Sequence, residues 1–404
     1  MKIAIATAVY YPQINGVAVF SHNLAVGLAK RGHEVLVICP SLNRKSRVEM
    51  QEGVKICYLR SVDVKVYPDQ VHPVTEKKGV GGVKLPKLFY RHGLPVSMFP
   101  QLEIKKILEG FKPDVVHVQV SDPIGLSVVG WARRHDVPVV TTEHNQPEVL
   151  TDSLKMPRMM KKGANVVLSA YFRNRQSKSD FVTMPTEMAV RDLLGEGEEF
   201  PVPVAAVSNG VDLTCFKPGK KASEPTVLYV GRLDPEKQVS QVVEAFKRVL
   251  ESVPEAKLVI AGDGVDKARL VKMVKDLELG RSVKFLGKVM PPEVYKVFQQ
   301  GWVFATASPI ETQGIVLIEA AASGLPLVAV DKGAVAEVCV DGVNGILCQS
   351  GSVSELADAL VKILTDEKLR DNYAQASVKI ASEHDFNRTL DKFINIYQRV
   401  IKDS

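Results

Sequence analysis

Short apolar segments alternate with amphipathic segments along the whole chain. The apolar segments are rich in valine, isoleucine and leucine without polar alternation, which is typical of strands buried on both faces of a parallel sheet. They predict strands over residues 2–7, 34–39, 54–59, 114–118, 138–144, 181–184, 226–231, 257–262, 283–287, 303–307, 327–330 and 345–348. The amphipathic segments predict helices over residues 16–30, 124–134, 239–253, 267–277, 314–322, 354–364 and 385–401. This alternation predicts an α/β fold with doubly wound parallel sheets.

The series is interrupted once, near the middle of the chain. An Asn209-Gly210 turn is followed by a polar, lysine-rich segment over residues 217–221. Each side of this interruption has its own set of strands. We therefore predict two facing Rossmann-like domains, residues 1–212 and residues from 225 onward, joined by a linker over 213–224. A cleft between two such sheets can enclose a ligand at the carboxyl ends of their strands. Residues 62–100 differ from both series and predict a long functional loop.

Composition narrows the class of protein. The chain has 404 residues, of which 46% are hydrophobic and 24% charged, and its formal net charge is +6. These values fit a two-domain globular protein rather than a disordered or fibrous one. The charge is small for a chain of this length, so nucleic acid is not an expected partner.

Cysteine usage and hydropathy bear on the compartment. The five cysteines are scattered and form no Cys-x-x-Cys pair, which fits a reducing compartment. The apolar N-terminal run is too short for a signal peptide. The longest apolar stretch, residues 315–330, is interrupted by Glu319, Gly324 and Pro326 and falls short of the roughly 20 residues of a membrane span. We expect a cytoplasmic chain whose membrane contacts are peripheral.

Signatures of several other enzyme classes are absent from the sequence. There is no Walker phosphate loop, no Gly-x-Gly-x-x-Gly after the first strand and no Gly-x-Ser-x-Gly elbow. No two aspartates are separated by a single residue, so the Asp-x-Asp metal clamp of metal-dependent sugar transferases is missing. We therefore expect no bound metal and no cofactor.

The start of the second domain carries two basic residues at a strand end. The strand over 226–231 leads into Arg232, and Lys237 is expected in the first turn of the next helix. A cation there opposes the helix dipole unless an anion compensates it. Arginine offers forked donors and lysine a point charge, a combination that suits a diphosphate. A solvated basic pair is the alternative.

Two glutamates further along bracket a loop that turns into a helix. Glu311 lies at the tip of this loop, and Glu319 lies eight residues later on an otherwise apolar helix that begins at Gly314. A carboxylate in apolar surroundings needs a partner. A capping carboxylate and a solvated helix position are the alternatives.

A third candidate lies after the first strand. The loop over residues 10–17 opens directly into a helix at Gly16. A glycine there lets an anionic ligand approach exposed helix amides. A plain Asn-Gly turn is the alternative.

Taken together, these stretches resemble the family 4 retaining glycosyltransferases, which have the GT-B fold. The resemblance rests on a Gly-Arg-Leu-x-x-Glu-Lys stretch over 231–237 followed by a Glu-x7-Glu motif at Glu311 and Glu319. Further matches run along the chain: residues 12–17, 113–118, 208–212 and 261–264. In this fold the closing helix returns to the first domain. The resemblance therefore assigns residues 385–404 to the first domain and leaves 225–384 to the second.

The resemblance also implies roles for the second-domain residues. Arg232 and Lys237 would hold the diphosphate of the sugar donor and stabilise the nucleotide that leaves. Glu311 would bind hydroxyls of the donor sugar, and Glu319 would accept hydrogen bonds from the ribose. The sugar and phosphate would face the backbone amides of Thr312, Gln313, Gly314 and Ile315.

Two first-domain residues complete the implied site. Gly16 would keep its loop thin over the phosphates. His144 matches a histidine that contacts the donor sugar near the reacting carbon, which would make it catalytic with Arg232, Lys237 and Glu311. Many members of the family have His-Asp or His-Thr here, whereas this chain has His144-Asn145, so the acceptor side differs.

The implied reaction transfers a hexose from a UDP- or GDP-linked sugar to an acceptor hydroxyl with retention of configuration. The acceptor would be a lipid, a lipid-linked saccharide or a soluble saccharide. A nucleotide-sugar epimerase of the same fold is the alternative enzyme, and a nucleotide-sugar binding module without activity is a further one.

Residues 154–180 combine basic and apolar side chains. Seven lysines and arginines are interleaved with methionine, valine and aromatic residues. This composition is typical of a segment that lies on an anionic membrane surface, and a solvated face is the alternative. Several members of the resembling family glycosylate lipids. We therefore expect a protein that binds peripherally to the inner face of the cell membrane.

Overall fold

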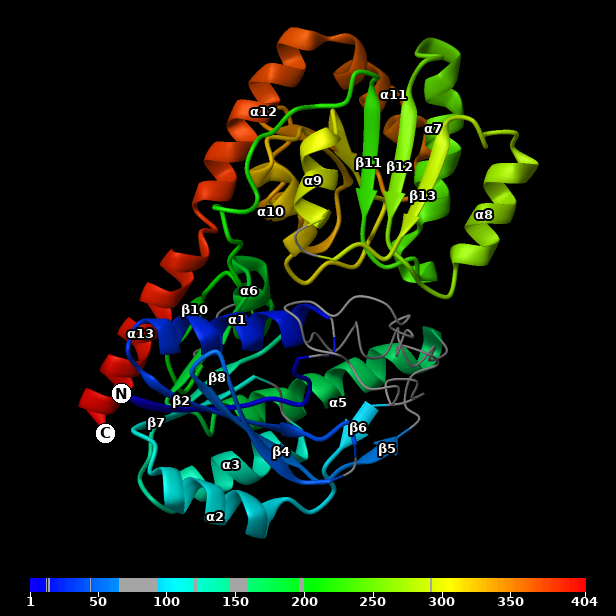
Figure 1. Cartoon of the computed structure of the whole chain (residues 1–404). Coiled ribbons are helices and arrows are strands. Elements are labelled where there is room, and N and C mark those ends of the chain that lie inside the picture. The colour runs from blue at the N-terminus through cyan, green and yellow to red at the C-terminus, as the bar shows by residue number, and fades with distance from the viewer. Residues whose placement is uncertain are drawn as a thin grey trace. The chain divides into compact units, whose positions relative to one another are not determined.

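The predicted strands and helices form two α/β units, each around its own sheet (Figure 1). The computed structural model describes the whole chain except residues 12, 14, 44, 65–93, 120–121, 145–157, 196–199 and 291–292. The first unit consists of Met1–Val207 and Leu390–Ser404, and the second of Ser208–Thr389.

The first unit contains an eight-stranded sheet in the order β10-β9-β8-β7-β1-β2-β4-β3. Its strands are β1 (Lys2–Ala6), β2 (Glu34–Pro40), β3 (Arg47–Gln51), β4 (Val54–Leu59), β7 (Val115–Val118), β8 (Val139–Thr142), β9 (Phe181–Met184) and β10 (Val204–Ala206). Neighbouring strands are parallel except β3 and β4. The central strands are buried along nearly their whole length, and β3 forms an exposed antiparallel edge.

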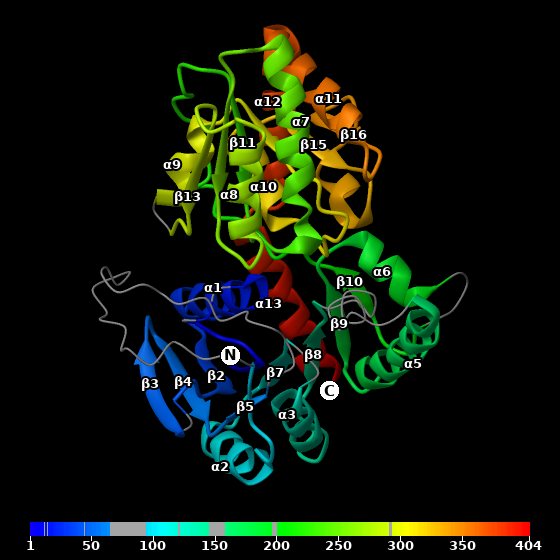
Figure 2. The same ribbon diagram turned by 90° about the vertical axis from the view of Figure 1, so that its right-hand side faces the viewer.

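Helices cover both faces of this sheet. They are α1 (Gly16–Lys30), α2 (Gln101–Phe111), α3 (Pro123–Arg133), α5 (Arg158–Gln176), α6 (Glu187–Leu194) and most of α13 (Phe386–Asp403). Side chains such as Ala4 and Val116 pack against α2 and α3. In both views, α1 and α13 lie on the other side of the sheet (Figure 1, Figure 2). There Phe20 of α1 contacts Phe393 of α13, with ring centroids 5.9 Å apart.

The second unit contains a six-stranded, fully parallel sheet in the order β13-β12-β11-β14-β15-β16. Its strands are β11 (Thr226–Val230), β12 (Lys257–Ala261), β13 (Val283–Gly287), β14 (Val303–Ala305), β15 (Leu327–Val330) and β16 (Gly345–Cys348). Its helices are α7 (Val239–Ser252), α8 (Lys267–Asp276), α9 (Glu293–Gln300), α10 (Ile315–Ala322), α11 (Val353–Thr365) and α12 (Glu367–Ser382), with 3-10 turns at η3 (Pro235–Lys237) and η4 (Gly333–Glu337).

Alternation along β11 divides the core of the second unit into two layers. Val227 and Tyr229 pack among residues of α7 and α11, whereas Leu228 packs among residues of α9 and α10. Successive strand residues point to opposite faces, so an apolar run without alternation is buried on both.

The doubly wound parallel architecture predicted from the sequence is confirmed. Every predicted strand and helix is present, with ends that differ by at most two residues. Strands β3 and β10 and helices α2, α5, α6, α9 and α12 were not predicted from the sequence. The predicted loop over 62–100 is wrong at its ends, where β5 (Val62–Val64) pairs antiparallel with β6 (Leu94–Val96) and α2 begins soon after. The rest of that loop, residues 65–93, lies outside the described residues.

The segment predicted as the linker, residues 213–224, is bonded to the second unit. Ala222 N donates to Gln300 O, and Trp302 Nε1 donates to Ala222 O at 2.8 Å. Contacts divide the chain after Val207 and after Thr389. The domain limits predicted from the sequence, at residues 212 and 385, remain a prediction.

The backbones of β11 and β12 are in direct contact at the carboxyl ends of the two strands. Gly231 N donates to Ala261 O at 3.0 Å, and Gly262 N donates to Gly287 O at 2.8 Å. A Cβ atom at Gly262 would lie 1.8 Å from Gly231 O. Only glycine fits here, because the opposing atom belongs to the backbone and cannot rotate away.

Gly262→Ala is therefore expected to lower the free energy of unfolding by about 3 kcal/mol, since β11 and β12 must separate. Thermal or urea unfolding measures this. Gly280→Ala is the matched control, because a Cβ there meets nothing within 4 Å. Equal stability of the two variants would contradict the close approach.

Candidate active site

The second-unit site begins where β11, β12 and β13 end at one edge of the sheet. The loop after β11 carries Arg232, Asp234 and Lys237, and Leu233 N donates to Asp263 O in the loop after β12 at 3.0 Å. Parallel strands end at the same edge, so residues far apart in sequence meet there.

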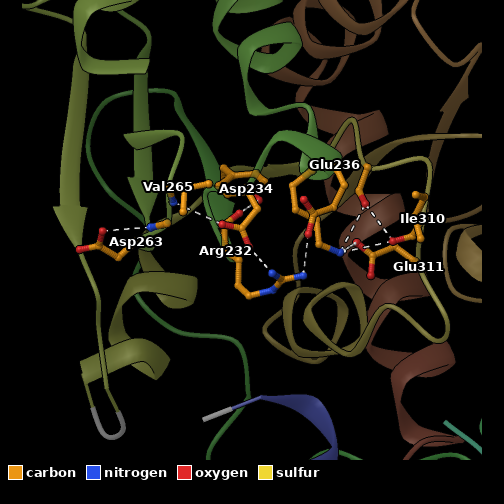
Figure 3. Close-up of polar contacts among 11 residues, drawn as sticks. Arg232, Asp234, Glu236, Asp263, Val265, Ile310 and Glu311 are labelled. Carbon is orange, nitrogen blue, oxygen red and sulfur yellow. Dashed lines mark hydrogen bonds and ion pairs between the residues drawn. The ribbon is translucent and has the colours of Figure 1, made fainter. Parts of the chain in front are cut away.

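Arg232 is held between two carboxylates (Figure 3). Its Nη1 donates to Asp234, and its Nη2 donates to Glu236 Oε1 at 3.0 Å. Asp234 is buried, and its Oδ1 also accepts from Val265 N at 3.3 Å. Asp234 thus ties the guanidinium to the loops after both β11 and β12, a role that the sequence analysis missed.

Lys237 and Glu311 form a half-buried ion pair. Lys237 Nζ lies 2.7 Å from Glu311 Oε1 and 3.3 Å from Ile310 O. The expected place of Lys237 is wrong: it ends the 3-10 turn η3, and Gln238, with φ of 49°, separates it from α7. Pro235 begins this short turn, and the left-handed Gln238 separates it from α7, which begins at Val239 as predicted. Lys237 therefore points toward the Glu311 loop, not along a helix.

The loop after Glu311 offers unpaired backbone amides. Gly314 has φ of 71° and precedes α10. No described residue accepts a hydrogen bond from the amides of Gln313, Gly314 or Ile315. Amides at a helix N-terminus favour an anionic ligand. Thr312 lies in the same loop.

The side chain of Gln313 is buried and tethers this loop. Its Nε2 donates to Ser208 Oγ at 2.7 Å, and its Oε1 accepts from Asn209 N at 3.2 Å. From the sequence, only the backbone of Gln313 was assigned a role. Its side-chain partners, Ser208 and Asn209, lie about a hundred residues away and have no marker in the sequence.

Glu319 is the one charged residue of α10, whose other residues are isoleucine, valine, leucine and alanine. No described residue donates a hydrogen bond to its carboxylate. Burial raises the pKa of Glu319 from about 4.5 to about 8. The carboxyl is therefore largely protonated at neutral pH, and can both donate and accept a hydrogen bond.

Gly16 and His144 belong to the first unit, whereas the other predicted site residues belong to the second. Gly16 is the exposed first residue of α1, and Asn15 before it caps the helix by accepting from Ala18 N at 2.9 Å. His144 follows β8 and is 7% exposed, and its Nε2 contacts Gln119 Oε1 at 2.8 Å. Burial lowers the pKa of His144 to about 4, so its ring is neutral. Asn145 lies outside the described residues.

Of the residues that the structure describes, no three histidine, cysteine, aspartate or glutamate side chains gather as a metal site would require. Nor does any helix in the described part of the chain combine the length and apolar character needed to cross a membrane.

Two family models match the chain. Residues 14–214 match "Glycosyltransferase Family 4", and residues 212–379 match "Glycosyl transferases group 1". The chain is 29% identical to alpha-monoglucosyldiacylglycerol synthase of Streptococcus pneumoniae over 81% of its length and 71% of that protein's. It is 27% identical to GDP-mannose-dependent alpha-mannosyltransferase of Mycobacterium tuberculosis over 99% and 97% of the two chains.

Solved structures share the fold. Sucrose-phosphate synthase from Thermosynechococcus elongatus superposes with a TM-score of 0.76 at 19% identity, covering 100% of both chains. The fold and the matches define the class: the chain is a glycosyltransferase with the GT-B fold. The two matched models follow one another along the sequence, and the protein is a glycosyltransferase of the family 4 type.

The raised pKa of Glu319 predicts a pH dependence of stability. The folded state holds a proton that the unfolded state releases between about pH 4.5 and pH 8, so the free energy of unfolding falls as the pH rises through this window. Glu319→Gln should remove this fall, which amounts to at most about 4 kcal/mol between pH 5 and pH 8. Urea unfolding across this range measures it. Glu255→Gln, at an exposed position before β12, should keep the wild-type slope, and an unchanged slope in Glu319→Gln would contradict the protonated carboxyl.

Proposed function

We propose that the protein transfers a hexose from a UDP- or GDP-linked sugar to an acceptor hydroxyl, with retention of configuration and without a metal ion. The observation that carries this proposal is the Lys237–Glu311 pair beside the unpaired amides of Gln313, Gly314 and Ile315. A cation from the β11 loop, beside a loop that carries a carboxylate and a set of N–H donors, offers the groups that phosphate and sugar hydroxyls require.

Binding of the sugar donor would exchange the partners of Lys237. A diphosphate carries more negative charge than the carboxylate of Glu311, and the Nζ atom lies at the same loop as the unpaired amides. Moving Lys237 to the phosphate would release Glu311 to accept hydrogen bonds from hydroxyls of the sugar. Arg232, 42% exposed, can reach the same phosphates while Asp234 keeps its guanidinium oriented.

Departure of the nucleotide builds negative charge on the β-phosphate. Arg232, Lys237 and the amide groups would stabilise that charge, which lowers the barrier to bond cleavage. The departing phosphate oxygen would then take the proton of the acceptor hydroxyl on the same face of the sugar, which retains the configuration. The neutral carboxyl of Glu319 would bind the ribose hydroxyls.

A lipid is the acceptor that we favour. The relative in Streptococcus pneumoniae is named as a glucosyldiacylglycerol synthase. In this chain, the outward face of α5 bears the exposed side chains of Met160, Val166, Val167 and Tyr171. The exposed Lys162 and Lys178 flank this face, so it suits an anionic bilayer at the inner face of the cell membrane.

The sugar donor and the type of reaction can be tested together. A thermal-shift panel of nucleotide sugars identifies the donor, because a ligand that binds the folded state stabilises it. The identified donor is then incubated with and without a diacylglycerol or saccharide acceptor. Conversion that needs an acceptor supports transfer, whereas conversion of the donor alone would indicate an epimerase.

Lys237→Ala and Glu319→Ala are each expected to reduce turnover at subsaturating sugar donor at least about tenfold, because each removes a contact to the nucleotide. Lys247→Ala, an exposed position on α7, is the control and should keep wild-type turnover. Unchanged turnover in both test variants would refute the assigned site.

Reversing two charges, one on α5 and one just after its end, tests the membrane surface. Lys162→Glu with Lys178→Glu should weaken binding to vesicles that contain anionic lipid by about tenfold or more, since each basic residue near the surface contributes about 1 kcal/mol. Co-sedimentation with vesicles measures this. Lys247→Glu with Lys275→Glu changes the net charge equally on the second unit and should leave binding intact. If the wild-type protein does not bind anionic vesicles, this face of α5 is not a membrane-binding surface.

A further inference from the structure

A chain of buried polar side chains connects the C-terminal helix to His144 inside the first unit. Tyr397 of α13 contacts His117 Nδ1 through its hydroxyl at 2.7 Å. Gln119 Nε2 lies 3.1 Å from His117 Nε2, and Gln119 Oε1 lies 2.8 Å from His144 Nε2. Tyr397, His117 and Gln119 are completely buried.

The sheet explains why these groups meet. His117 and Gln119 are two residues apart at the end of β7, so their side chains lie on the same face. The register pairs His117 with Val140 of the neighbouring β8, and His144 lies just beyond the end of that strand. Gln119 N donates to Ala6 O at 2.9 Å, which anchors its backbone to the end of β1.

The hydrogen bonds determine where the proton of His144 lies. An amide oxygen only accepts, so His144 must donate from Nε2 to Gln119 Oε1. Burial lowers the pKa of His144 to about 4 and that of His117 to about 3, so both rings carry a single proton. In His144 the remaining nitrogen, Nδ1, is then an acceptor, and no described residue donates to it.

We propose that Gln119 is a positioning residue for His144: it holds the ring as the Nε2–H tautomer and so presents Nδ1 as an acceptor for a hydroxyl of the donor sugar. This inference rests on the proposed function of His144. Tyr397 and His117 keep the amide of Gln119 in the orientation that this requires. A neutral ring also places no positive charge beside the anomeric carbon, where positive charge develops when a glycosidic bond breaks.

Aromatic side chains pack around these hydrogen-bonded residues and help to keep the ring of His144 in place. Phe20 of α1 meets the His144 ring edge-on at 5.3 Å between centroids, and Phe393 of α13 lies 5.1 Å from the ring of His117. Thr142 bonds His117 Nε2 at 2.7 Å and Thr183 at 2.6 Å. The polar groups that face Gln119 are thereby themselves held.

The tautomer can be read directly by long-range ¹H–¹⁵N NMR on full-length protein with labelled histidines, with His144→Gln to assign the signal. Wild type should show a proton on Nε2 of His144. Gln119→Met fills the same volume without an acceptor and should lose this fixed tautomer. Gln119→Glu keeps an oxygen that faces His144 Nε2, so the proton should stay on Nε2 in this variant. This second variant keeps the test decisive if Gln119→Met does not fold. A proton confined to Nδ1 in wild type would overturn the proposal.

Kinetics separate positioning from a structural role. With the sugar donor that stabilises wild type, Gln119→Met should lower kcat about tenfold and leave the donor KM within about twofold, because one hydrogen bond to the reacting sugar is lost. Tyr397→Phe should lower kcat less, and should add nothing in the Gln119→Met background. Gln101→Leu on the surface of α2 is the control. Wild-type kcat and tautomer in Gln119→Met would overturn the positioning role, whereas wild type that binds no nucleotide sugar would refute only the proposed function.

Discussion

The backbone contact between Gly231 and Gly262 is the constraint on which the second-unit site depends. Parallel strands bring their carboxyl ends to one edge, but they do not by themselves bring the following loops together. Here the absence of a side chain at Gly262 lets the loop after β12 lie directly on Gly231 O. Leu233 then bonds Asp263, and Asp234 bonds Val265, so Arg232 starts from a fixed backbone. The backbone from which Arg232 extends is thus fixed by the meeting of two strands, and Asp234 and Glu236 hold its guanidinium.

Every cation that the site would present to a phosphate is already paired with a carboxylate. Lys237 pairs with Glu311, and Arg232 pairs with Asp234 and Glu236. Pairing avoids the cost of leaving a half-buried charge alone. A phosphate that binds here as proposed would have to compete with carboxylates that are already in place. A ligand with several negative oxygens would compete better than one with a single charge, which agrees with the proposed diphosphate.

The sequence predicted the strands well because runs such as Val227–Val230 are buried on both faces and leave no other interpretation. The β11 loop and the Glu311 loop were assigned to one site by the family resemblance of their motifs. The sequence misplaced Lys237 because the separate 3-10 turn η3 and the left-handed Gln238 after it have no marker in the sequence. It missed β3, whose Val48 and Met50 face solvent, since such an edge strand lacks the buried pattern. The partners of Gln119 and Gln313 stayed hidden, because hydrogen bonds between residues far apart in sequence follow from the fold.

Gln313 links the proposed donor loop to the two places where the chain passes between its units. Ser208 is the first residue of the second unit and Thr389 the last. Ser208 Oγ accepts from Gln313 and bonds His384 Nδ1 at 2.9 Å, while Thr389 Oγ1 donates to Ser208 O at 2.9 Å. Separating the buried amide of Gln313 from Ser208 and Asn209 would cost about 1–3 kcal/mol, the penalty of an unsatisfied polar group. A shift of the Glu311 loop small enough to keep those bonds must therefore move Ser208 with it. If Lys237 exchanges Glu311 for a phosphate as proposed, an accompanying shift of this loop would reach Ser208 and Asn209 through the amide of Gln313.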